Sequence, residues 1–121
     1  MNKQIEVIHN ILPLLSSIEE GLNHTKIQIS ELRFEESLEL LEDSMLGIAS
    51  IEQSLEPISE IPKDKISYLI TDLKNSILKV VENYEKGKQE LIENQIEKEV
   101  IPSFKNWKQE LEATLKPYTI S

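Results

Sequence analysis

Residues 34–55, FEESLELLEDSMLGIASIEQSL, contain the pattern that decides the fold of this chain. Apolar side chains recur there at gaps of four and three residues, and the series is interrupted once, at Glu52. Its members are Phe34, Leu38, Leu41, Met45, Ile48 and Leu55. Such spacing places apolar side chains along one face of an α-helix. Seven acidic residues and no basic residue lie within 34–56, so the stretch predicts an amphipathic helix with an acidic outer face.

Three other segments have the same periodicity and predict partner helices over 2–23, 63–86 and 89–115. The first apolar stripe consists of Ile8, Ile11, Leu15, Ile18 and Leu22. The stripe of 63–86 consists of Ile66, Ile70, Leu73, Ile77, Val80 and Tyr84. The last stripe consists of Ile92, Ile96, Val100, Phe104, Trp107, Leu111 and Leu115. Four such helices in 121 residues predict one all-α domain, 1–121, folded as an up-down-up-down antiparallel four-helix bundle.

Two prolines fall inside predicted helices. Pro13 and Pro102 each lack the amide hydrogen that would bond the carbonyl four residues earlier, which predicts a kink in the first and in the last helix. The alternative is that each proline ends a helix. Gly21, with Asn23 and His24, predicts the end of the first helix, and residues 25–33 are expected to form either an ordered loop or a short helical turn.

Charge and composition exclude several classes of partner. The net charge of −9 argues against binding to nucleic acid or to an anionic membrane, because both depend on clustered lysine and arginine. The segment 34–56 carries seven acids, whereas 63–88 carries six lysines against four acids, so these two helices are expected to be neighbours. The chain has no cysteine and no apolar run approaching the ~18 residues of a membrane span, so a cytoplasmic location is expected.

The sequence contains little that predicts chemistry. Glu6 and His9 have the Glu-x-x-His spacing of di-iron bundles, but only one copy is present, whereas such a centre uses two. No nucleophile stands in a recognisable motif with a base, and no glycine-rich loop is present to bind phosphate. We therefore expect no enzymatic activity, no catalytic residue, no metal and no cofactor. A bundle that handles a metal ion or a phosphoryl group through His9 is the alternative.

Two segments carry a resemblance to known proteins: residues 37–43, SLELLED, and residues 99–107, EVIPSFKNW. In these segments the chain resembles small acidic helix-bundle proteins of unknown function from Gram-positive bacteria. The resemblance implies a helical bundle in the bacterial cytoplasm and implies no catalytic residue. In size, acidity and helix content the chain is also similar to flagellar and type III export chaperones.

The apolar residues outnumber the positions of the four stripes, and this surplus predicts an interaction surface. We expect a non-enzymatic, chaperone- or adaptor-like module that binds a partner helix in an apolar groove or forms a homodimer. Gly47 is expected to let a neighbouring helix approach closely, and Trp107 to lie in the core or in the groove. The candidate surface consists of Leu40, Leu46, Gly47, Leu69, Leu78, Leu91, Ile101 and Trp107.

Overall fold

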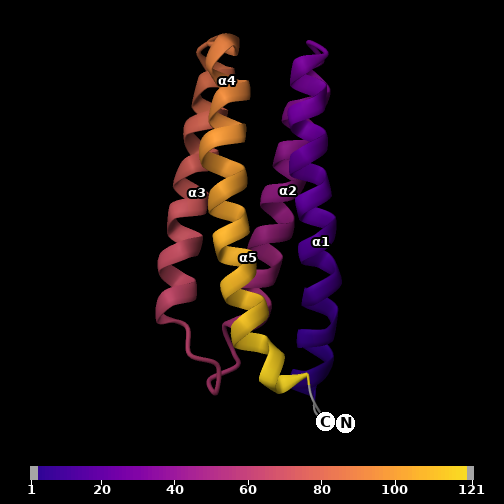
Figure 1. Ribbon diagram of the computed structural model, residues 1–121, viewed down its shortest axis with the longest axis vertical. Helices are drawn as coiled ribbons and strands as arrows, with labels where there is room; N and C mark the ends of the chain where they lie inside the picture. Colours follow the sequence, from indigo (N-terminus) through magenta and orange to yellow (C-terminus); the bar gives the residue numbers. More distant parts are fainter. Residues whose placement is uncertain (1–2, 120–121) are drawn as a thin grey trace.

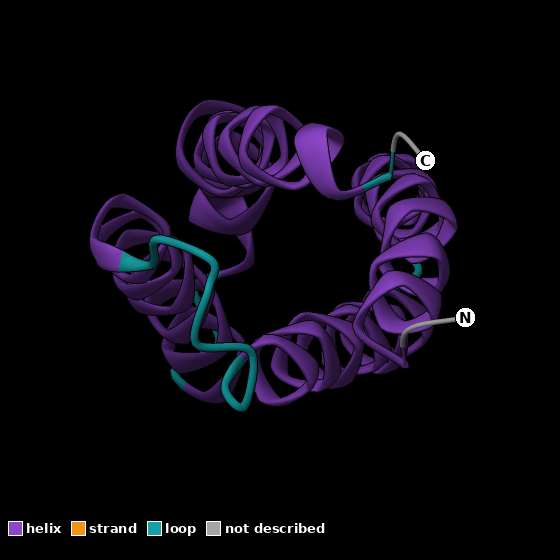
Figure 2. Cartoon of the chain, turned by 90° about the horizontal axis from the view of Figure 1, so that it is seen from below, coloured by secondary structure: helices purple, strands orange, loops and turns teal. Residues whose placement is uncertain are grey.

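The computed structural model describes residues 3–119, and every regular element in them is helical. The elements are α1 (Lys3–Ser30), α2 (Phe34–Leu55), α3 (Asp64–Glu85), α4 (Gln89–Gln95), η1 (Ile96–Val100), α5 (Ile101–Leu115) and η2 (Lys116–Tyr118). Because α4, η1 and α5 follow one another without a break, they form one helical path, and the described chain has four such paths. Figure 1 places the start of α1, the end of α5 and the α2–α3 connection at one end of the molecule. Figure 2 shows the four paths around a common axis, which confirms the predicted four-helix bundle.

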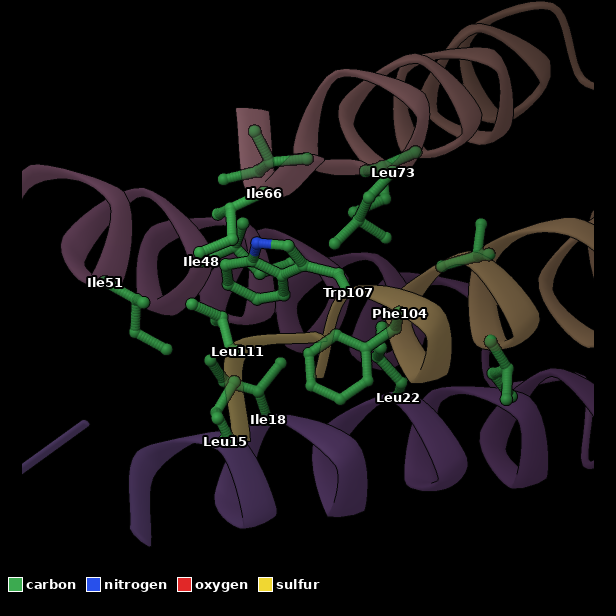
Figure 3. Close-up of a cluster of buried hydrophobic side chains, with 14 of the residues drawn as sticks. Leu15, Ile18, Leu22, Ile48, Ile51, Ile66, Leu73, Phe104, Trp107 and Leu111 are labelled. Atoms are coloured by element: carbon green, nitrogen blue, oxygen red, sulfur yellow. The ribbon is translucent and has the colours of Figure 1, made fainter. Parts of the chain in front are cut away.

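One apolar cluster fills the space between the helices. Leu41 of α2, Leu73 of α3 and Trp107 of α5 are fully buried in it, and Figure 3 shows how the side chains around Trp107 converge. All the predicted stripe residues of α1 and of the last helix are buried, as are those of α3 up to Val80. Ile58 and Ile61 of the α2–α3 connection are buried as well and cover one end of the cluster. The Tyr118 hydroxyl donates a hydrogen bond to the carbonyl of Glu60 at 3.0 Å, which ties this connection to η2.

The inward face of α2 differs from the prediction. Ser37, Ser44 and Ile51 are buried, whereas the predicted stripe residues Leu38 and Met45 are only half-buried. The buried positions of α2 are Ser37, Leu41, Ser44, Ile48, Ile51 and Leu55, an unbroken series of steps of four and three. A pattern search that counts only apolar residues misses this face because it ignores the two serines. Their hydroxyls donate to carbonyls of their own helix, so burial leaves neither unpaired.

Small residues bring α1 and α2 together. A methyl group added at Gly21 would lie 3.0 Å from Ser44 Oγ, and one added at Gly47 would lie 3.0 Å from two carbons of Ile18. Both distances are shorter than ordinary contacts, so a side chain at either position would require Ser44 or Ile18 to shift by a few tenths of an ångström at the present spacing of the two helices. The close approach of a neighbouring helix expected at Gly47 is thus found. Gly21 was predicted to mark a helix end, but it lies inside α1, where it also faces the neighbouring helix at short distance.

The first helix is longer than predicted. It continues through residues 25–30 to Ser30, so the predicted end at 23 is wrong, and of the two forms expected for 25–33 the helical one is found over 25–30, followed by a turn at 31–33. The reason is that Thr25 and Ile29 extend the inward stripe of α1 by two more steps, and both are buried. The Thr25 hydroxyl is satisfied by donating to the carbonyl of Gly21 at 2.8 Å, so a polar residue occupies a core position at little cost.

Neither proline ends its helical path. Pro13 lies inside α1, and Pro102 lies in the first turn of α5, directly after the π-helical turn η1. The buried residues before and after Pro102 are spaced by four residues three times in succession: Ile92, Ile96, Val100 and Phe104. In a regular α-helix each step of four residues turns the side chain by about 40° beyond one full turn, so the buried face would drift around the helix. The wider turn η1 takes up this excess, because the Ile101 amide bonds the carbonyl of Ile96, five residues back. The kinks themselves stay a prediction.

A leucine in a left-handed conformation closes α1. Leu32 has φ 63°, and the amide of Arg33 bonds the carbonyl of Gln28 at 2.8 Å, the arrangement in which a helix end usually carries glycine. The side chain of Leu32 is 76% exposed. We expect Leu32→Gly to raise the free energy of unfolding by about 0.5–1 kcal/mol in urea titrations, because the relief of backbone strain exceeds the added flexibility of the unfolded chain.

Gly87 is the matched control for this substitution. It closes α3 at φ 70° with no atom near its missing side chain, so Gly87→Ala should lower stability by about 1 kcal/mol through backbone strain alone. A loss of stability in Leu32→Gly would contradict the prediction and would mean that the leucine side chain makes a stabilising contact.

Candidate functional site

The candidate surface residues do not form one surface. Leu46, Leu78 and Leu91 are 70%, 55% and 44% exposed, on α2, α3 and α4 respectively. Leu40 and Leu69 are half-buried, and Gly47 faces Ile18 of α1. Ile101 and Trp107 are buried, with 9% and 0% exposure, so their place on an accessible surface is wrong. The core position expected for Trp107 is confirmed, because its ring packs edge-to-face on Phe104 with centroids 5.8 Å apart.

The four neighbouring helix pairs differ in how tightly they pack. The α1–α2 pair and the pair made by α3 with the α4–η1–α5 path are close, whereas α2 and α3 make the sparsest contact of the four. We call the boundary between these two helices the α2–α3 seam. One ion pair crosses it, from Lys74 to Glu52, as expected from the opposite charges of the two helices. Both partners are largely exposed, so the pair contributes little to stability.

Two contacts define the register of the α2–α3 seam. The hydroxyl groups of Ser37 and Tyr84 are 2.6 Å apart, and further along the pair Glu52 contacts Lys74. Burial raises the pKa of Tyr84, while the hydrogen bond to Ser37 acts in the opposite direction, so the phenol is neutral at ordinary pH. Paired one for one in antiparallel helices, the first contact sets residue 76 of α3 level with residue 45 of α2 and the second sets residue 81 there, so Met45 lies at the height of 76–81.

Of the two most exposed leucines of the candidate set, Leu78 lies beside the seam, because it follows Lys74 by one turn on the side of α3 that faces α2. Leu46 lies on the outer face of α2, because it is six residues from Glu52 and therefore points about 120° away from it around the helix. Met45 precedes Glu52 by two turns and Val81 follows Lys74 by two turns, so both face the seam, where they pack half-buried against the core. The middle of the seam is thus an apolar strip open to solvent.

A pocket of about 440 Å³ opens at the end of the seam nearest the α2–α3 connection. Its inner wall is apolar and includes Leu55, Ile66, Ile70 and Trp107. Polar residues stand at the mouth. Glu52 is paired with Lys74, and the Lys63 ammonium donates to the backbone carbonyl of Glu56 at 2.9 Å.

Trp107 gives this pocket an unusual feature. The indole Nε1 atom is buried and has no hydrogen-bond partner among the described residues. Figure 3 shows this nitrogen on the edge of the ring nearest Ile66, which also lines the pocket. An unsatisfied buried donor costs about 1–3 kcal/mol, so a partner for this N–H would be stabilising. The spacing of apolar residues predicted that the ring of Trp107 is buried. It could not predict that the indole N–H lacks a hydrogen-bond partner, because this depends on which side chains surround the ring in the folded protein.

The candidate residues for metal or phosphoryl chemistry lie apart from the seam. His9 is exposed on α1, and the acidic residues at the start of α2 are exposed along its outer side. Within residues 3–119 no group of three histidine or acidic side chains is arranged to hold a metal ion. The alternative that uses His9 gains no support from this geometry and stays a prediction.

Comparison with known proteins assigns the chain to a family. Residues 6–110 match the family model described as a domain of unknown function, DUF8042. The chain belongs to the DUF8042 family. No curated protein and no solved structure matches it. The predicted resemblance to helical proteins of unknown function is confirmed at this level. The DUF8042 match covers the seam, the pocket and Trp107, so all three belong to the family domain.

The helices of this DUF8042 domain are amphipathic along their length. In residues 3–119 no helix contains an apolar stretch long enough to cross a membrane.

Proposed function

We propose that this DUF8042 protein is a non-enzymatic interaction module, chaperone- or adaptor-like, that holds an amphipathic helix of another protein on the α2–α3 seam. The observation that carries the proposal is the sparse contact between α2 and α3, beside which Leu78 is 55% exposed at the height of Met45. Met45 and Val81 are half-buried in the same seam. An amphipathic helix laid along such a strip buries apolar residues spaced by three and four.

Charge favours a basic partner helix over a second copy of this chain. The chain carries −9, and α2 contributes acidic residues along the outer side of the seam, including Glu42. A second copy would bring an equally acidic α2 toward this one, and like charges oppose that contact. A helix with lysine or arginine beside its apolar stripe would complement the same surface. We place this function in the bacterial cytoplasm, in line with the resemblance of residues 37–43 and 99–107.

The test uses a synthetic peptide as the probe. An 18-residue helix of leucine and lysine with leucines at steps of three and four is titrated into the protein, and binding is followed by calorimetry. A peptide of identical composition with its leucines scattered around the helix is the reference. We expect the patterned peptide to bind at least about tenfold more tightly, because only it presents a continuous apolar face.

The matched variants are Met45→Gln with Leu78→Gln, and Leu91→Gln as the control. Glutamine has nearly the same helix propensity as methionine and leucine and adds no charge, so only apolar area changes. The double variant should weaken the patterned peptide at least about tenfold, and Leu91→Gln less than about twofold, since Leu91 lies on α4 away from the seam. Equal binding of the two peptides, or equal weakening by the two sets of variants, would contradict the proposal. A dimer that Met45→Gln with Leu78→Gln dissociates would replace it with self-association.

A further inference from the structure

The pocket at the end of the α2–α3 seam is lined by several apolar side chains and by Trp107, which carries a buried polar atom without a partner among the described residues. Leu55, Ile66 and Ile70 supply the wall, and the indole N–H of Trp107 is the unpaired donor. Trp107 has no exposed surface, and its nitrogen lies on the ring edge nearest Ile66 (Figure 3). The donor is thus held in a fixed direction by the core and is shielded from competing water, which strengthens any hydrogen bond that it makes.

The charges at the mouth restrict which acceptor can enter. Glu52 and Glu56 line the pocket, while Lys63 and Lys74 already contact a carbonyl and a carboxylate. An anionic ligand would therefore approach two carboxylates with no cation at the inner wall to stabilise it. An uncharged oxygen, such as that of a ketone, ester, amide or ether, meets no such penalty.

We propose that this pocket is a binding site for a small uncharged molecule with an apolar body and one acceptor oxygen, which accepts a hydrogen bond from Trp107 Nε1. The volume of about 440 Å³ lies within the range of small-molecule sites. The apolar body replaces water against Leu55, Ile66 and Ile70. The oxygen supplies the partner that the indole lacks. This site is independent of the helix-binding function, because the strip formed by Met45, Leu78 and Val81 is not part of the pocket wall.

The single tryptophan of the chain allows a direct test. In a ¹⁵N–¹H correlation spectrum of the intact protein, the side chain of Trp107 gives the only indole N–H signal. The probes are acetophenone and α-methylstyrene, which have nearly the same shape but carry a carbonyl oxygen or a methylene group at the same place. We expect acetophenone to move the indole proton downfield to saturation and to bind about tenfold more tightly than α-methylstyrene, since only acetophenone supplies the missing acceptor.

Two variants separate binding in the pocket from unspecific effects. Ser67 is exposed and lines the pocket, so Ser67→Phe should obstruct the mouth and weaken acetophenone at least about tenfold. Thr71→Phe, at an exposed position one turn further along α3 and outside the pocket, should leave binding unchanged. Trp107→Phe keeps an aromatic ring but removes the donor, so ligand-detected titrations with this variant should give equal affinities for the two probes.

Three results would overturn the proposal. They are an indole signal that neither probe moves, equal affinities of the two probes for the natural protein, and equal effects of Ser67→Phe and Thr71→Phe. None of these results depends on whether the leucine–lysine helix binds at the seam. If the small-molecule site is disproved, the proposed helix-binding function is unaffected, and if helix binding is disproved, the small-molecule site is unaffected.

Discussion

Phe104→Ala is expected to lower the free energy of unfolding by about 3–5 kcal/mol, because it empties a site in the middle of the core. Phe104 is fully buried, and Figure 3 shows it among side chains of α1 and α5. The substitution removes the whole ring, leaves a cavity and deletes the edge-to-face contact with Trp107 at 5.8 Å. Urea titrations followed by circular dichroism measure the change.

The controls for this prediction keep it testable even if the alanine variant is barely folded. Phe104→Leu retains most of the volume and should lose only about 1–2 kcal/mol. The neighbouring Lys105 is exposed, so Lys105→Ala should change stability by less than about 0.5 kcal/mol. A loss below about 1 kcal/mol in Phe104→Ala would mean that the cluster closes around the missing ring or that the ring is not buried.

Gly47→Val is expected to lower the free energy of unfolding by about 2–3 kcal/mol. Even the first carbon of a side chain at this position would lie 3.0 Å from Ile18 Cδ1 and Cγ1, and Ile18 is only 4% exposed. The valine therefore has to push α1 and α2 apart. This penalty exceeds the gain in helix propensity of at most about 1 kcal/mol that follows when a helical glycine is replaced.

The matched control is Ser50→Val, on an exposed position of the same helix. It introduces the same side chain without a neighbour to displace and should change stability by less than about 0.5 kcal/mol in the same urea titrations. If Gly47→Val were as stable as the natural protein, the close contact between α1 and α2 would not be required for folding.

Sequence patterns predicted the helices well where apolar residues alone form the inward face. The stripes of α3 and of the last helix were recognised because Leu, Ile, Val, Phe and Trp occupy nearly every core position in them. Prediction failed where small or polar residues replace apolar ones. The inward face of α2 was not recognised because Ser37 and Ser44 occupy two of its buried positions. The continuation of α1 was not recognised because Thr25 occupies the next buried position of that helix. Their hydroxyls are satisfied within their own helices, so the core accepts residues that a hydrophobicity pattern rejects.

The candidate site was predicted in part. Leu46 and Leu78 were singled out because they fall outside the apolar stripes, and both are exposed. The same reasoning included Ile101, which is buried. The pocket and the orphaned indole N–H were beyond prediction, because each depends on distances between helices that are far apart in the chain.

The sequence by itself determined that this DUF8042 chain folds as an amphipathic, acidic, all-helical domain, because the spacing of apolar residues is a local property that each helix expresses on its own. Its three successive steps of four residues before Phe104 also carried the signal for the π-helical turn. Only the tertiary structure decided which seam is open. The distance between two helices depends on the side chains that both bring to the contact. Gly21 and Gly47 let α1 and α2 pack closely, while α2 and α3 meet sparsely and leave Leu78 and the pocket beside Trp107 accessible.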